Sequence, residues 1–144
     1  MTDFSDYTEN KLIDHIFRGT AFTAPGTLYF ALYTGAPSDS GGGTEVSGGS
    51  YARVAVTPNS TNFANTQNSG TGVSSGTGGL TSNLTAITFP TPTGTWGLVT
   101  HIAILDASSA GNFIITDQLT ASKNIGLGDP APVISIGQFT FTIA

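Results

Sequence analysis

The residues closest to a catalytic pattern surround Ser74, where the sequence reads GVSSG from Gly72 to Gly76. A G-x-S-x-G pattern activates its serine when a strand leads into a sharp turn and a helix follows. Here the serine lies in a tract of Ser, Gly, Thr and Asn, so composition alone accounts for the match. The histidines available as a general base are His15 and His101, in separate segments. We therefore predict that the protein is not an enzyme and has no catalytic residues.

A second candidate is the glycine-rich stretch from Gly41 to Gly49, which precedes the alternating segment SYARVAV. A phosphate-binding loop needs a lysine and a Ser or Thr at the start of a helix, so that backbone amides and an ammonium converge on phosphate. No lysine follows this stretch, and the next segment alternates as a strand. We interpret it as a flexible connecting loop that fits between protein surfaces rather than around a phosphate.

One histidine and one tryptophan have alternative roles. His15 follows Asp14 near the end of a predicted helix, where the helix dipole favours a cation, so its expected role is structural. Trp96 could stack on a sugar ring or fill the core, and its position at the start of the strongest apolar strand favours the core. With no cysteine, two isolated histidines and scattered acids, the sequence predicts no metal site and no cofactor.

The chain is unusually poor in charge. Of its 144 residues 9% are charged, the net charge is −5, and from Val54 to Leu105 it has no Asp, Glu, Lys or Arg. The four basic residues are scattered, which predicts no nucleic-acid partner. The acidic start predicts no signal peptide, and no apolar run approaches the roughly 18 residues of a membrane helix, so we predict no membrane association. A surface with so little charge favours a protein that is covered by protein partners.

The strongest helical signal lies in the first eighteen residues. Apolar side chains recur at spacings of three and four from Phe4 to Phe17, acids come early, and Arg18 comes last. Ser5 or Thr8 could serve as the N-cap, and Gly19 stands where a C-terminal capping glycine belongs. We predict an N-terminal helix within residues 1–19.

The rest of the chain, residues 20–144, predicts strands and turns. Alternating or apolar segments suggest strands at 27–35, 50–58, 84–89, 95–106, 112–119 and 132–143. Both faces of the first segment are apolar, so it should be covered on both sides. In the segment 95–106, strict alternation puts His101 on one face with Val99, Ala103 and Leu105, where we expect a partly buried, hydrogen-bonded histidine.

These elements predict the fold class. One helix followed by six or so short strands indicates a mainly β, single-domain antiparallel β-sandwich, jelly-roll-like, over residues 1–144. Two long loops interrupt it, Gly35 to Ser50 and Pro58 to Asn83; the second is functional, ordered by a partner, or partly strand. The residues expected to form most of the core are Leu28, Phe30, Leu32, Leu98, Val99, Ile102, Ile104, Ile114, Phe139 and Phe141.

The order of the segments resembles a family of short virion structural proteins of tailed bacteriophages, often labelled tail fibre proteins. The resemblance covers nearly the whole chain. Its most specific parts are the helix running into RGTAFTAP, the segment GGSYAR and the strand WGLVTHIAILDA. It implies a β-rich particle component with no catalytic motif, and leaves open whether that component sits on the head or the tail.

The leading functional hypothesis is a capsid decoration or cement protein, expected on the particle surface with the head favoured over the tail. In this hypothesis its partners are the major capsid protein and itself, as a homotrimer, because cyclic symmetry lets one small fold clamp several subunits. It would pass through the host cytoplasm during assembly. Alternatives are a tail or baseplate component and, more distantly, a glycan-binding module that uses Trp96 and the tyrosines.

Overall fold

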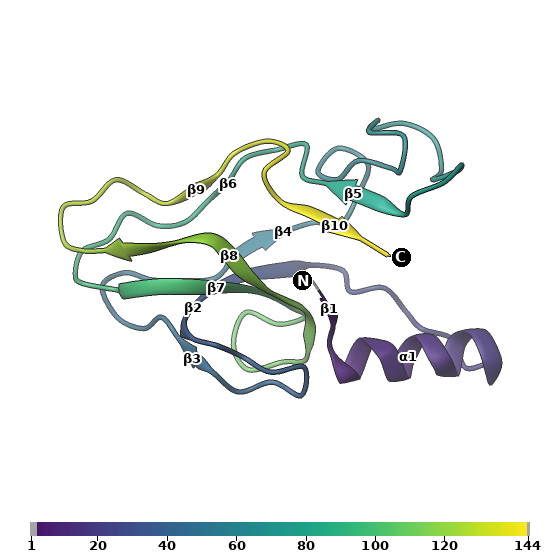
Figure 1. Cartoon of the computed structure of the whole chain (residues 1–144), viewed down its shortest axis with the longest axis horizontal. Helices are drawn as coiled ribbons and strands as arrows, with labels where there is room; N and C mark the ends of the chain where they lie inside the picture. The colour runs from purple at the N-terminus through teal and green to yellow at the C-terminus, as the bar shows by residue number, and fades with distance from the viewer. Residues whose placement is uncertain (1–2, 144) are drawn as a thin grey trace.

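A computed structural model describes residues 3–143, and it shows a mainly β molecule with one helix at its N-terminal end (Figure 1). Every strand pairing within these residues is antiparallel. The predicted antiparallel β-sandwich with an N-terminal helix is therefore confirmed. The large sheet has six strands; in spatial order they are β1 (Asp3–Phe4), β8 (Phe113–Ile125), β7 (Gly97–Leu105), β2 (Leu28–Gly35) and β3 (Thr44–Glu45), while β4 (Val54–Val56) also pairs with β2.

The second layer is built from two small sheets rather than one (Figure 1). The first joins β5 (Leu80–Ser82) to β10 (Thr140–Thr142), and the second joins β6 (Ile87–Thr88) to β9 (Val133–Ile134). The core cluster lies between the layers: the large sheet contributes Phe30 and Ile104, and the second layer contributes Phe89 and Phe141. Phe30 also meets the ring of Phe139 edge-on, with centroids 5.3 Å apart.

The centre of the molecule is the β2–β7 pair, whose two faces are both buried as the sequence predicted. On the inner face Phe30 lies opposite Ile104 and Leu32 opposite Ile102, while on the outer face Ala31 lies opposite Ala103. Ala31, Ala103, Tyr33 and Leu105 form a second apolar cluster, against which Phe113 packs. Because both faces of these two strands carry apolar residues, both faces must be covered, and the pair therefore lies in the middle of the sheet.

One face assignment within β7 is wrong. Val99 does not share a face with Ala103 and Leu105 but joins Ile102 and Ile104 in the inner core. The physical reason is a register shift between Val99 and His101, because such an irregularity moves one part of a strand to the opposite face. His101 itself lies on the outer face, where it pairs with Tyr33.

The predicted core is confirmed with two exceptions. Leu98 is 52% exposed, because it lies on the outward side of β7 next to the buried Val99. Leu28 is half-buried and packs at the edge of the cluster. The other eight predicted residues are buried; they are Phe30, Leu32, Val99, Ile102, Ile104, Ile114, Phe139 and Phe141.

The helix begins later than predicted. Helix α1 spans Asp6–Phe17, and Phe4 instead pairs with Ile115 as part of β1. Met1 and Thr2, which fall in the predicted helical segment, lie outside the described residues. Ser5 is the N-cap, and its side chain accepts from the Thr8 backbone N–H at 3.3 Å. Both cap predictions hold, since Gly19 follows the C-cap with φ +70°, a conformation that glycine adopts readily.

Several predicted strands are shorter or divided. The segment 50–58 pairs only at Val54–Val56, and 84–89 only at Ile87–Thr88. The segment 132–143 splits into β9 and β10, because the side chain and backbone of the buried Asn83 take the hydrogen bonds of the residues between them. Both long loops contain short strands, β3 in the first and β5 in the second. In the second loop, the alternative of partial strand structure is therefore confirmed.

We expect the β2–β7 pair to dominate stability. Phe30→Ala and Ile104→Ala remove fully buried side chains and should each cost about 2–5 kcal/mol of unfolding free energy. Leu98→Ala, on the same sheet but half-exposed, is the matched control and should cost less than about 1 kcal/mol. Urea denaturation followed by tryptophan fluorescence measures all three, and equal losses for Leu98 and Ile104 would contradict the assignment of faces.

Candidate interaction surface

The residues that could have done chemistry lie on separate elements. Ser74 is exposed in the irregular stretch before β5, and its Oγ accepts a hydrogen bond from the Thr66 backbone N–H at 3.3 Å. His15 lies on α1, where its Nδ1 accepts from the Phe22 backbone N–H at 3.2 Å. His101 is half-buried on β7, with Nδ1 2.8 Å from Thr100 Oγ1. Each side chain is engaged in holding local structure, as expected for the two histidines.

Trp96 belongs to the core, as the sequence favoured. It is 5% exposed, its ring meets Tyr51 edge-on with centroids 5.3 Å apart, and its Nε1–H donates to the Gly49 carbonyl at 2.9 Å. The sugar-stacking alternative for this tryptophan is therefore wrong. Gly49 has φ +53°, and a Cβ there would lie 3.0 Å from the indole nitrogen, so the glycine permits the close approach.

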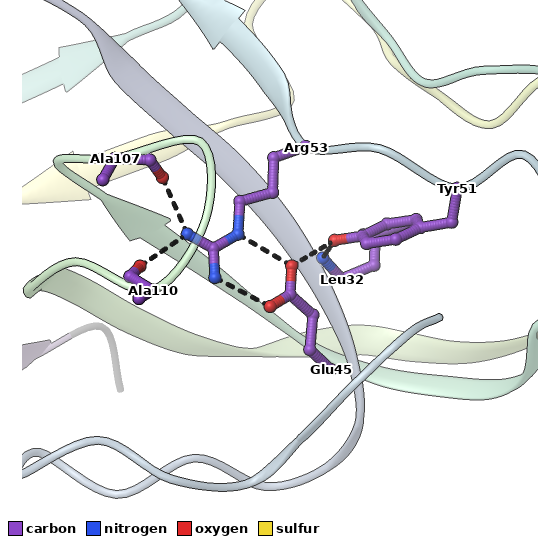
Figure 2. A network of polar contacts seen from close by, with 6 residues as sticks. All are labelled: Leu32, Glu45, Tyr51, Arg53, Ala107 and Ala110. Atoms are coloured by element: carbon purple, nitrogen blue, oxygen red, sulfur yellow. Dashed lines mark hydrogen bonds and ion pairs between the residues drawn. The ribbon is translucent and has the colours of Figure 1, made fainter. Parts of the chain in front are cut away.

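A partly buried ion pair between Arg53 and Glu45 holds the glycine-rich stretch 41–49 in place (Figure 2). The Arg53 guanidinium donates to both carboxylate oxygens of Glu45, each at 2.8 Å. Its remaining terminal nitrogen donates to the carbonyls of Ala107 and Ala110 in the β7–β8 loop, at 2.7 and 2.8 Å. The hydrogen bond with Glu45 raises the pKa of Arg53. One side chain therefore joins β3, the segment before β4 and the β7–β8 loop.

Tyr51 extends this network to the central strand (Figure 2). Its hydroxyl donates to Glu45 Oε1 at 3.0 Å and accepts from the Leu32 backbone N–H at 2.9 Å. Burial raises the pKa of Tyr51 far above its ordinary value, and burial together with the Glu45 carboxylate raises the pKa of Tyr33 to about 12. The segment GGSYAR is thus a structural clamp, which no sequence pattern had indicated.

We expect Arg53→Ala to be strongly destabilising. Its side chain is 7% exposed, and its loss leaves the Glu45 carboxylate and two carbonyls without their donor, which should cost about 2–4 kcal/mol. Arg18→Ala is the control, because it breaks an exposed ion pair with Asp14 that should contribute less than about 1 kcal/mol. Denaturant titration at pH 7 compares the two, and similar losses would show that the clamp carries little stability.

We expect stability to fall in alkaline solution. Tyr33 and Tyr51 have raised pKa values when folded, so the stability they contribute is fully present below about pH 10, the ordinary tyrosine value, and is lost as pH rises toward 12. Tyr51→Phe removes one of the two groups and should make this decline shallower, although the variant is less stable at pH 7. Unfolding free energies between pH 8 and 11.5 test this, and an unchanged slope in the variant would contradict it.

The surface presents an apolar stripe on α1. Ile13, Ile16 and Phe17 are spaced as i, i+3 and i+4, so they lie on one face of the helix, and they are 52%, 64% and 80% exposed. Only the first turns of α1 are anchored: Thr8 Oγ1 donates to the Ile114 carbonyl at 3.0 Å, and Tyr7 packs against the core. Figure 1 shows the rest of the helix extending away from the large sheet.

An apolar pocket opens between the two layers. Its volume is about 370 Å³, and its walls come from the large sheet, the β5–β10 sheet and the loop before β5. The rim is formed by uncharged polar residues, among them Asn59, Ser60 and Ser69. The apolar side chains that line it are Leu28, Phe63, Ile104, Ile115, Phe139 and Phe141.

Within residues 3–143, no group of three or more His, Asp or Glu side chains is arranged to hold a metal ion. In the same part of the chain, no helix is both long enough and apolar enough to cross a membrane. What the described surface offers is a combination of exposed apolar side chains and neutral hydrogen-bonding groups. Exposed apolar patches are one of the marks of protein interaction sites.

The sequence also matches a known protein family. A family described as podophage GP4 fiber I protein gp80 matches residues 3–142, nearly the entire chain. The chain belongs to this family. The predicted resemblance to phage virion structural proteins is thereby confirmed, and the protein is a structural component of a phage particle. No curated protein matches the sequence.

Sequence reasoning missed both the stripe and the pocket. The spacing of Ile13, Ile16 and Phe17 was visible, but the same spacing is typical of a helix that packs on its own core. What distinguishes this helix is its short anchored segment. Ser5 and Thr8 form hydrogen bonds with the β8 backbone, and the contact between the helix and the sheet ends after one or two turns. The pocket had no sequence signal, because its walls come from segments that lie far apart in the chain.

Proposed function

We propose that the protein is a non-enzymatic fibre component of the podophage particle that assembles as a homotrimer. The observation that carries the proposal is the exposed apolar stripe Ile13, Ile16 and Phe17 on a helix that its own sheet leaves uncovered over its last turns. In water such a stripe favours association, at roughly 25 cal/mol for each Å² of apolar surface buried. The family description, which names a fibre protein, favours the fibre over other places in the virion.

The charge distribution supports contacts with neighbouring subunits. The stretch from Val54 to Leu105 carries no Asp, Glu, Lys or Arg, and much of its irregular part, residues 65–79, is exposed. Protein interfaces deplete charge at their centres, and neutral contacts are little weakened by salt. Trimeric symmetry repeats each contact three times, so individually modest contacts add up through avidity.

A capsid cement that bridges major capsid proteins is the second candidate. It is favoured by the same charge-poor stretch, which would let the protein lie against large capsid surfaces without electrostatic matching. In that case the partner is the major capsid protein rather than a fibre or tail subunit. The two candidates differ in where the subunit sits on the particle.

We expect the purified protein to have three times the 14.7 kDa mass of its chain, and the same mass at raised salt. Sedimentation equilibrium measures this. A density map of the intact particle then places the subunit. Density at a fibre supports the leading proposal, density across capsid three-fold positions supports the cement role instead, and a monomer absent from particles would contradict both.

A further inference from the structure

We infer that the helix stripe of one copy inserts into the apolar pocket of the next copy, so that the trimer closes by exchange of helices. This inference deepens the proposed function and rests on its self-association. The stripe consists of Ile13, Ile16 and Phe17, and the pocket is the 370 Å³ cavity lined by Leu28, Phe63 and Phe141 among others. Each copy thus carries both halves of a heterologous contact.

The volumes of the two halves are compatible. An apolar protein cavity of about 150 Å³ accepts a benzene molecule. A pocket of about 370 Å³ therefore has room for roughly two groups of that size, such as the ring of Phe17 and the side chain of Ile16. The walls are chiefly aromatic and branched aliphatic side chains, with which both incoming groups pack well.

The charges of the two halves are also compatible. Asp14 and Arg18, which flank the stripe, form an ion pair at 2.8 Å, and the exposed Glu9 lies four residues before Ile13 on the stripe's own face of the helix. The pocket rim is built from Asn, Ser and Gly, with no acidic or basic residue among the lining side chains. Insertion of Ile16 and Phe17, which lie about two helical turns beyond Glu9, therefore buries apolar surface while the Glu9 carboxylate stays in solvent outside the rim.

Helix α1 does not rotate into the pocket of its own copy, because both of its ends are held in place. The N-terminal end of α1 is fixed to β8 through the Ser5 and Thr8 hydrogen bonds, and the Asp6 backbone N–H donates to the Asp39 carbonyl at 3.1 Å. At the other end, His15 holds the chain that follows the helix through the Phe22 backbone N–H. In Figure 1, α1 points outward on the same side of the molecule as β5 and β10, which suits contact with a neighbour.

The surface area that this contact buries can be compared with that of a standard protein interface. A buried aromatic side chain removes about 150–250 Å² from water. Phe17 and Ile16, for which the pocket has room, therefore supply roughly a third of the ~800 Å² per partner of a standard interface. The exposed loop 65–79 beside the pocket can supply polar contacts around them. In a closed ring every copy makes this contact twice, once with its helix and once with its pocket.

The absence of cysteine from the chain permits a direct test. Thr20→Cys places a thiol just beyond the stripe, and Ser60→Cys places one at the pocket rim, both on exposed residues. The two single variants are produced together, one with a size tag, and treated with a short bis-maleimide. We expect crosslinks between position 20 of one copy and position 60 of another to predominate. Because each chain has one thiol, every crosslink joins two copies.

The control replaces Thr20→Cys with Leu127→Cys, on the exposed turn after β8, and should give little crosslinking to Ser60→Cys. Predominant links between two Thr20→Cys chains would overturn the inference in favour of helix–helix pairing. An oligomer without links between positions 20 and 60 would overturn it as well, while leaving the proposed trimer intact. A wild-type protein that is monomeric at every concentration would instead remove the proposed function on which the inference rests.

A second pair of variants tests the stripe without crosslinking. Phe17→Asp should weaken self-association at least about tenfold, because a charge replaces an apolar group that enters the pocket. Leu127→Asp makes the same change at a comparably exposed apolar residue and should leave association unchanged. Both residues are more than two-thirds exposed in the subunit, so circular dichroism should show folded protein in each case. Equal effects of the two substitutions would contradict a specific role for the stripe.

Discussion

The rest of the structure depends on the pairing of β2 with β7. Each strand is apolar on both faces, so the pair must be covered from both sides, and it therefore occupies the centre of the large sheet. The second layer covers the inner face through Phe89, Phe139 and Phe141, and Phe113 packs against the outer cluster. The second layer consists of two small sheets joined by loops; it buries Ile87 and Phe89 almost fully and leaves an apolar pocket at Phe141.

The ion pair between Arg53 and Glu45 explains how so much glycine can form ordered structure. Glycine-rich chain loses more conformational entropy on folding than other sequences, so it needs strong local contacts to stay in one conformation. Arg53 provides four hydrogen bonds in a largely buried position, and Tyr51 connects the pair to the backbone of β2. A loop whose composition suggests flexibility is therefore part of the rigid frame.

This division between a rigid frame and an uncovered helix fits a particle component. A subunit that folds before assembly needs a core that is complete without neighbours, and the buried β2–β7 pair supplies it. A subunit that must then join others needs apolar surface held in a defined direction, and α1 supplies that because its anchor to β8 fixes its orientation. The stretch from Val54 to Leu105 carries no Asp, Glu, Lys or Arg, so contacts within it depend on shape, apolar surface and neutral hydrogen bonds rather than on ion pairs.

The sequence by itself determined the fold class, the capping glycine at Gly19, an N-cap at Ser5 or Thr8, the buried Trp96 and eight of the ten predicted core residues, because these follow from local periodicity and from the chemistry of individual side chains. It also indicated a structural protein of a phage virion, through family resemblance. Only the tertiary structure decided that Val99 faces the inner core while Leu98 is exposed, because the register shift between Val99 and His101 depends on the partner strand. It alone showed the Arg53 clamp, the uncovered stripe on α1 and the pocket beside Phe141. The clamp and the pocket join residues distant in the chain, and the stripe stays uncovered because of how α1 is attached to the sheet, so all three depend on packing rather than on any local pattern.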